Sequence, residues 1–240
     1  MSADGLIGRA RLLDTLERAL AEGQTVLLFG PIGSGKTAVL HALARRARAR
    51  GVPCAVAERT ASLPDFTSAL ASAYPDLDTS GRTQRLARSR LLGAVEQRPP
   101  LILLDHLVVR GRALKAALKP FRGTGAGVLL AADVEHERDH RTVRELRLAY
   151  LETEIPRLHG HSMRALLRRL LVQRAPRRPL APSDLAELVT AAEGLPGRAV
   201  WFSEALSREE GWSSDRPRVD WLRSEAVIRG AERYRADLTR

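Results

Sequence analysis

One segment constrains the fold of this 240-residue chain more than any other, and it reads Gly30-Pro31-Ile32-Gly33-Ser34-Gly35-Lys36-Thr37. The apolar run TVLLFG leads into it, and the alanine- and leucine-rich run AVLHALARRARARG follows it. The first run is typical of a buried parallel strand, and the second is typical of a helix. Glycines between a strand and a helix let backbone N–H groups wrap around phosphate oxygens. The sequence therefore predicts a phosphate-binding loop (P-loop) formed by these residues.

Lys36 and Thr37, at the end of this loop, have the chemistry that ATP and Mg²⁺ require. The Lys36 ammonium group is expected to reach the β- and γ-phosphates of ATP. The Thr37 hydroxyl is expected to bind Mg²⁺, which prefers hard oxygen ligands. The alternative is a chance glycine-rich turn, but the flanking strand and helix argue against it.

An acidic partner for the Mg²⁺ shell is predicted at Asp105, which ends the apolar run Leu101–Leu104. This residue is expected to act on the metal through water, and the alternative is that it caps the next helix. His106 follows, where many hydrolytic P-loop ATPases have a glutamate that orients the attacking water. Histidine can accept a proton but suits that role less well. We therefore expect ATP hydrolysis to be slow or to depend on a partner.

Short apolar runs alternate with helical patterns through the first two thirds of the chain. Strands are predicted within 25–30, 52–60, 101–107, 127–133 and 151–158. This alternation predicts an α/β fold, a parallel sheet covered by helices on both faces. Three helical patterns without a strand follow after about residue 160. We predict an α/β nucleotide-binding core in residues 1–158, followed by a small all-helical lid domain and a C-terminal helix in residues 159–240.

Composition excludes several classes of protein. The single cysteine, Cys54, cannot form an internal disulfide, and no Cys/His cluster has zinc spacing. No apolar run approaches the roughly 18 residues that a membrane span requires. We therefore expect a cytoplasmic protein with no membrane partner, in which Cys54 is a small core residue.

The net charge of +11 and the isoelectric point near 11.0 suggest a polyanionic partner such as DNA. All but three of the 39 basic residues are arginine, as a GC-rich genome would produce without selection for DNA binding. The position of the charge is therefore more informative than its sum. Residues 155–183 contain seven arginines and no acidic residue. The candidate DNA contacts in this stretch are Arg164, Arg168, Arg169, Arg174, Arg177 and Arg178. A solvated face or a subunit interface is the alternative.

The order of these motifs resembles the AAA+ ATPases over about residues 6–206. The similarity is greatest to the branch of origin-recognition-type, transposition-accessory and signalling (STAND) ATPases. The segment Leu6–Leu13 resembles the family's GRxxEL box, with Leu12 in place of the usual glutamate. The resemblance implies that Ile7 and Arg9 help to enclose the adenine. It also implies that Asp133, at the end of the fourth predicted strand, is the sensor 1 residue, although its charge would repel a γ-phosphate.

Gly194-Leu195-Pro196-Gly197-Arg198 resembles the turn that opens the family's sensor 2 helix. Arg198 would then contact the γ-phosphate from the lid and couple its angle to the nucleotide state. In such ATPases a neighbouring subunit often supplies a further arginine, and Arg144 and Arg147 lie in the corresponding helix. The resemblance therefore implies a homo-oligomer.

Two functions from different classes follow. The first is an ATP-dependent switch that oligomerises on DNA to recruit or regulate a separate protein partner, as transposition-accessory and initiator ATPases do. The alternative is a STAND-like protein-interaction switch that binds no nucleic acid. A small-molecule kinase is disfavoured, because such kinases do not need a helical lid with a late arginine.

Overall fold

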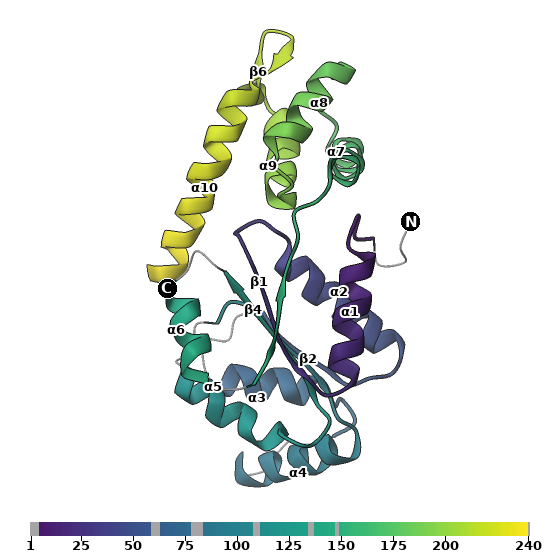
Figure 1. The fold of residues 1–240 in the computed structure, drawn as a ribbon, viewed down its shortest axis with the longest axis vertical. Coiled ribbons are helices and arrows are strands. Elements are labelled where there is room, and N and C mark those ends of the chain that lie inside the picture. The colour runs from purple at the N-terminus through teal and green to yellow at the C-terminus, as the bar shows by residue number, and fades with distance from the viewer. Residues whose placement is uncertain are drawn as a thin grey trace. The chain divides into compact units, whose positions relative to one another are not determined.

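The structure of the protein is a computed structural model that describes residues 5–58, 63–77, 84–107, 111–133, 137–146 and 149–239 (Figure 1). The chain forms two compact units. The core unit contains Ser2–Pro31 and Lys36–Ile155. The helical unit contains Ile32–Gly35 and Pro156–Arg240.

A five-stranded parallel sheet in the order β2-β3-β4-β1-β5 forms the centre of the core unit. The strands are β1 (Thr25–Gly30), β2 (Cys54–Ala57), β3 (Leu101–Leu104), β4 (Gly127–Asp133) and β5 (Leu151–Glu154). The helices are α1 (Ala10–Ala21), α2 (Lys36–Ala49), α3 (Leu63–Ser72), α4 (Gln84–Gln97), α5 (Gly111–Leu118), the 3-10 helix η1 (Lys119–Phe121) and α6 (Glu137–Leu146). The α/β fold with a parallel sheet, predicted from the alternating pattern, is confirmed.

Helices cover both faces of this sheet (Figure 1). Val26 and Leu28 of β1 lie in a buried cluster with α1 and α2, whereas Leu27 lies in a second cluster with α3 to α6. Successive side chains of a strand point to opposite faces, so each face has its own apolar layer. Burial on both faces explains why the strands read as continuous apolar runs rather than as alternating patterns.

Cys54 lies in the apolar layer that faces α1 and α2. Burial raises the pKa of its thiol to about 11. The thiol is therefore protonated at neutral pH, where it lacks the nucleophilic thiolate form. This agrees with the interpretation of Cys54 as a small core residue.

Gly127, the first residue of β4, packs directly against the end of α1. A Cβ atom at Gly127 would overlap the carbonyl oxygen of Leu20. We expect Gly127→Ala to lower the free energy of unfolding by about 1–3 kcal/mol, because α1 and β4 must move apart. Urea unfolding measures this change.

Gly93→Ala in α4 is the matched control, because a Cβ atom there meets nothing within 4 Å. Alanine is expected to stabilise this helix position by about 0.5–1 kcal/mol. A Gly127→Ala variant as stable as the wild type would contradict the close packing of α1 on β4.

The helical unit contains α7 (Gly160–Arg174), α8 (Pro182–Ala191), α9 (Pro196–Leu206), η2 (Glu209–Gly211), β6 (Trp212–Ser213), β7 (Arg216–Pro217) and α10 (Val219–Thr239). Leu167, Leu188 and Phe202 are fully buried at its centre. The pairing of β6 with β7 was not predicted, because two-residue strands are too short to show a periodic pattern. None of the helices in the described part of the chain is both long and apolar enough to cross a membrane.

Candidate nucleotide-binding site

The predicted P-loop connects β1 to α2 in the conformation that a glycine-rich turn permits. Gly33 and Gly35 have φ angles of +78° and +97°. Residues with a Cβ atom rarely adopt such positive φ angles, whereas glycine adopts them readily. The helix α2 begins at Lys36, so its first backbone N–H groups have no partner within the helix. These N–H groups and the positive end of the helix dipole suit a phosphate group.

Lys36 is held by oxygen atoms at the carboxyl end of the sheet. Its Nζ donates hydrogen bonds to the carbonyl oxygens of Gly30, at 2.9 Å, and Pro31, at 3.0 Å. It also forms an ion pair with the carboxylate of Asp133, and both side chains are largely buried, at 8% and 14% exposure. The register of the sheet explains this pair, because Asp133 of β4 lies opposite Gly30 of β1.

Thr37 and Asp105 meet across the same edge of the sheet. The Thr37 hydroxyl donates a hydrogen bond of 2.6 Å to Oδ2 of Asp105, whose side chain is almost completely buried. Asp105 follows β3, and β3 pairs with β4, so sheet order brings the two residues together from positions 68 apart in the sequence. A hydroxyl and a carboxylate are hard oxygen donors and fit Mg²⁺, with phosphates and water as its remaining ligands.

His106 has an unusual backbone conformation directly after Asp105. Its φ angle is +44°, and its backbone N–H donates to Oδ1 of Asp105 at 3.0 Å. The imidazole is half exposed, and its Nε2 lies 4.0 Å from Oδ2 of Asp105, beyond hydrogen-bond distance. Histidine tolerates the left-handed region better than β-branched residues do. The side chain therefore lies beside the predicted metal-binding carboxylate without a hydrogen bond to it.

Arg198, the predicted sensor 2 residue, is ion-paired within the helical unit. Its Nη1 lies 2.9 Å from Oε2 of Glu193, and Arg223 of α10 lies 2.9 Å from Oε1 of the same carboxylate. The hydrogen bond from Arg198 is the main reason why the pKa of Glu193 lies below its usual value, and the charge of Arg223 adds to it. Glu193 therefore remains ionised at neutral pH and links α9 to α10. The sequence did not suggest this role for Glu193.

The remaining predicted site residues are Ile7 and Arg9, expected to enclose the adenine, and Arg144 and Arg147, expected to act on a neighbouring subunit. Arg9 precedes α1 and is buried, and burial lowers the pKa of its guanidinium group. Ile7 is half-buried in the turn before it. Arg144 is exposed on α6, and Arg147 lies outside the described residues.

The predicted DNA contacts of the helical unit divide into two groups. Arg164, Arg168 and Arg169 are exposed on α7. By contrast, Arg174 pairs with Glu204 at 3.2 Å, and Arg177 and Arg178 both pair with Glu209 at 2.6 Å.

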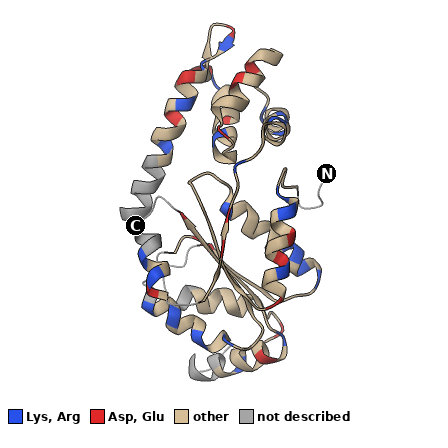
Figure 2. Cartoon of the chain, in the orientation of Figure 1, with Lys and Arg blue, Asp and Glu red and all other residues tan. Residues whose placement is uncertain are grey.

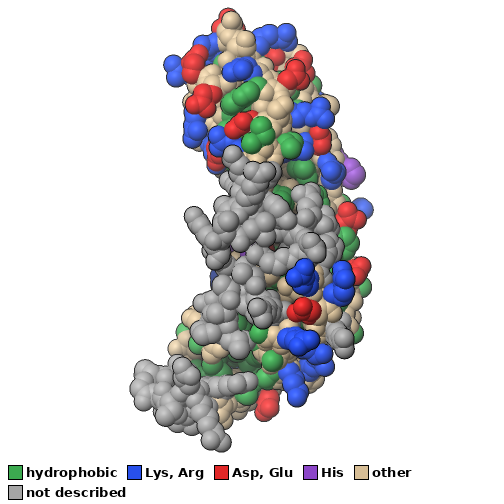
Figure 3. Space-filling view, turned by 90° about the vertical axis from the view of Figure 1, so that its left-hand side faces the viewer, with side chains coloured by type: hydrophobic (Ala, Val, Ile, Leu, Met, Phe, Trp, Pro, Cys, Tyr) green, Lys and Arg blue, Asp and Glu red, His purple; other side chains and the backbone are tan. Residues whose placement is uncertain are grey.

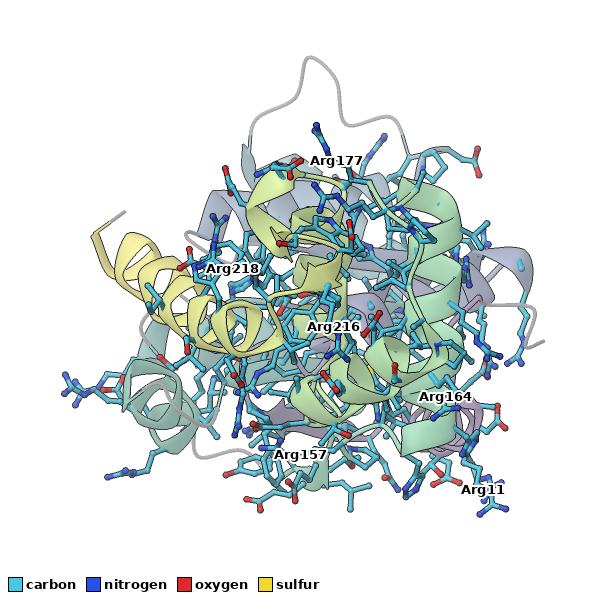
Figure 4. The ribbon with its side chains drawn as sticks, turned by 90° about the horizontal axis from the view of Figure 1, so that it is seen from above. Arg11, Arg157, Arg164, Arg177, Arg216 and Arg218 are labelled. Carbon is cyan, nitrogen blue, oxygen red and sulfur yellow. The ribbon has the colours of Figure 1, made fainter. Side chains whose placement is uncertain are left out.

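The labelled arginines also point in different directions. Seen from above, Arg157, Arg164 and Arg177 lie on different sides of the helical unit (Figure 4). Residues 155–183 contain no acidic residue in sequence, but carboxylates from α9 and η2 reach this stretch in the fold. Sequence reasoning could not find these partners, because they come from later in the chain.

Comparison with known families and structures identifies the fold. The family model described as "AAA ATPase domain" matches residues 5–193. A comparison with curated proteins found no match.

Three solved structures share the fold at low sequence identity. The Walker-type ATPase PABY2304 of Pyrococcus abyssi is 14% identical, with a TM-score of 0.59, and the match covers 99% of this chain and 75% of that one. The Aeropyrum pernix ORC2 protein is 16% identical, with a TM-score of 0.54 and coverage of 93% and 68%. AMPPCP-bound DnaA from Aquifex aeolicus is 17% identical, with a TM-score of 0.53; the match covers 85% of this chain and spans 62% of DnaA. The family match covers most of the chain, and the geometry of the P-loop agrees with it. This chain therefore belongs to the AAA ATPase domain family of nucleotide-binding P-loop proteins.

Proposed function

We propose that this protein binds ATP with Mg²⁺ and acts as a nucleotide-dependent switch that oligomerises on DNA to recruit or regulate a partner protein. The observation that carries the ATP-binding part is the convergence of Lys36, Thr37 and Asp105 beside the glycine loop. Backbone N–H groups of residues 33–37 and the Lys36 ammonium group would hold the phosphates. Thr37 directly, and Asp105 through water, would hold Mg²⁺, which neutralises phosphate charge when bound.

Arg198 is the proposed source of the switch. Its contact with Glu193, at 2.9 Å, lies within the distance range of charge-assisted hydrogen bonds, and a phosphate could replace the carboxylate. Because Glu193 also pairs with Arg223, a change at Arg198 would alter the forces between α9 and α10. The bonds of Arg198 would then differ between the ligand-free and ATP-bound protein.

Net charge and the similar structures support the DNA-binding part. The chain carries a formal charge of +11. One structure of the same fold, 15% identical with a TM-score of 0.52, is described as "Replication initiator DnaA bound to AMPPCP and single-stranded DNA". The STAND-like alternative has one observation in its favour: Arg174, Arg177 and Arg178 of the predicted DNA contacts are already paired with carboxylates.

DNA retention distinguishes these two functions. We expect the protein to bind duplex DNA more tightly with a non-hydrolysable ATP analogue than without nucleotide. We also expect binding to weaken steeply as salt increases, because bound phosphates release counterions. Filter retention across a salt series measures both effects. No retention at low salt with bound nucleotide would contradict DNA binding and favour the STAND-like switch.

His106→Glu is expected to raise ATP turnover. A glutamate at this position could orient and deprotonate the attacking water, and general-base assistance contributes about 10²–10⁴-fold. The left-handed backbone at His106 reduces the gain, so we expect an increase on the order of tenfold. Phosphate release under saturating ATP measures it. His106→Gln has a similar shape without the charge and is expected to give no increase. Brisk turnover by the wild-type protein alone would contradict this interpretation of His106.

A further inference from the structure

Four cations follow one face of α5 and continue along η1 in the core unit. They are separated by three, four and three residues, the spacing that repeats on one side of a helix. These residues, here called the α5 row, are Arg112, Lys115, Lys119 and Arg122. All are exposed except Lys115, which is half-buried. At about 1.5 Å of rise per residue the row is about 15 Å long.

A basic groove adjoins the row between α5 and α6. Its volume is about 520 Å³. The described residues that line it are Arg112, Lys115, Arg141, Arg144 and Glu145. All of these residues are charged, and only Glu145 is acidic. Figure 2 marks positions of Lys and Arg in blue on both helices, and Figure 3 shows a group of Lys and Arg side chains on one face of the core unit. The groove and the α5 row therefore form one positive surface.

The α5 row differs from the arginines at the end of α7 in its surroundings. Among the residues that the structure describes, no carboxylate lies within ion-pair distance of any member of the α5 row. By contrast, Arg174, Arg177 and Arg178 pair with Glu204 or Glu209. A cation that must leave a carboxylate before it binds a phosphate contributes less net free energy. Among the described residues, no carboxylate has to be displaced from the α5 row before it binds a phosphate.

We propose that the α5 row and the adjoining groove bind the phosphate backbone of DNA. This inference rests on the DNA-binding part of the proposed function. One strand of a duplex presents a phosphate about every 3.4 Å along its axis, so a row of about 15 Å faces several phosphates. A protein partner would instead need apolar or aromatic anchors at the centre of its contact. The described lining of the groove at Arg112 and Lys115 offers none, whereas Phe121 and Tyr150 line a separate hollow at Arg122. Because phosphate contacts carry no base information, this surface binds without sequence preference.

Two double variants test the proposal, Arg112→Gln with Lys115→Gln and Lys119→Gln with Arg122→Gln. Fluorescence anisotropy measures binding of a labelled random-sequence duplex across a salt series, with a non-hydrolysable ATP analogue present. Each phosphate contact contributes about 0.9 to the slope of log K against log salt, so each double variant should lower the slope by about 1.8. The midpoint of thermal unfolding should stay near that of the wild type, because these side chains make no ion pairs among the described residues.

Arg18→Gln with Arg208→Gln is the matched control. It removes the same charge from exposed positions in α1 and just before η2, and it should leave the slope unchanged. Wild-type slopes in both α5-row variants would overturn the proposal. So would an α5-row variant that alters self-association but not DNA binding, because the surface would then be a subunit interface. If the wild type binds ATP but no DNA, this proposal and the DNA-binding part fail while the nucleotide switch stands. If the wild type does not bind ATP, the proposed function itself fails.

Discussion

Lys36→Ala is expected to lower ATP affinity by about 100-fold or more, because charge-assisted bonds of about 1.5–3 kcal/mol each are lost from two phosphates. The Lys36 ammonium group already lies at the loop, held by the carbonyl oxygens of Gly30 and Pro31. It therefore needs little further ordering to bind a phosphate. Isothermal titration calorimetry with ATP and Mg²⁺ measures the loss. Unchanged affinity would overturn the assignment of the P-loop.

The same substitution should also destabilise the ligand-free protein. A control variant is therefore needed to separate this loss of stability from the loss of ATP binding. Removal of Lys36 leaves the largely buried Asp133 carboxylate without this partner. The double variant Lys36→Ala with Asp133→Asn removes both charges and should recover much of the lost stability. Both variants should bind ATP much more weakly than the wild type, so a folded double variant that still binds weakly shows that Lys36 acts on the nucleotide itself.

Asp133→Asn is expected to raise ATP affinity by about tenfold, which corresponds to about 1.4 kcal/mol. In the ligand-free protein the Asp133 carboxylate neutralises Lys36, and a phosphate must compete with it for the ammonium group. A carboxylate at the end of β4 would also repel a nearby phosphate. Asparagine keeps the shape and removes both effects. Calorimetric titration with ATP measures the change.

Adenosine provides the control for Asp133→Asn, because it lacks phosphates and its affinity should not change. A fall in ATP affinity would mean that Asp133 orients Lys36 for the nucleotide rather than competes with it. The sequence-based assignment of Asp133 as sensor 1 remains a prediction. A negative charge at position 133 would repel a γ-phosphate. The ion pair between Asp133 and Lys36 gives a structural reason for an aspartate there.

Much of the core unit could be predicted because its signals are local. The runs TVLLFG, LILL and GVLLAAD became β1, β3 and β4, since a strand buried on both faces needs continuous apolar residues. The P-loop could be recognised because its glycines, Lys36 and the start of α2 follow one another directly in the sequence. The β6–β7 pair could not, because strands of two residues have no period to detect.

Which charges meet was decided only by the tertiary structure. The sequence alone determined that Lys36, Thr37 and Asp105 belong to an ATP-binding pattern, and that residues 155–183 are rich in arginine. The fold decided that Asp133 pairs with Lys36, that Glu193 holds Arg198, and that Glu209 pairs with Arg177. It also left the α5 row without a carboxylate partner among the described residues. The physical reason is that electrostatic attraction depends on distance in space, and sheet order and helix packing set that distance for residues far apart in the chain.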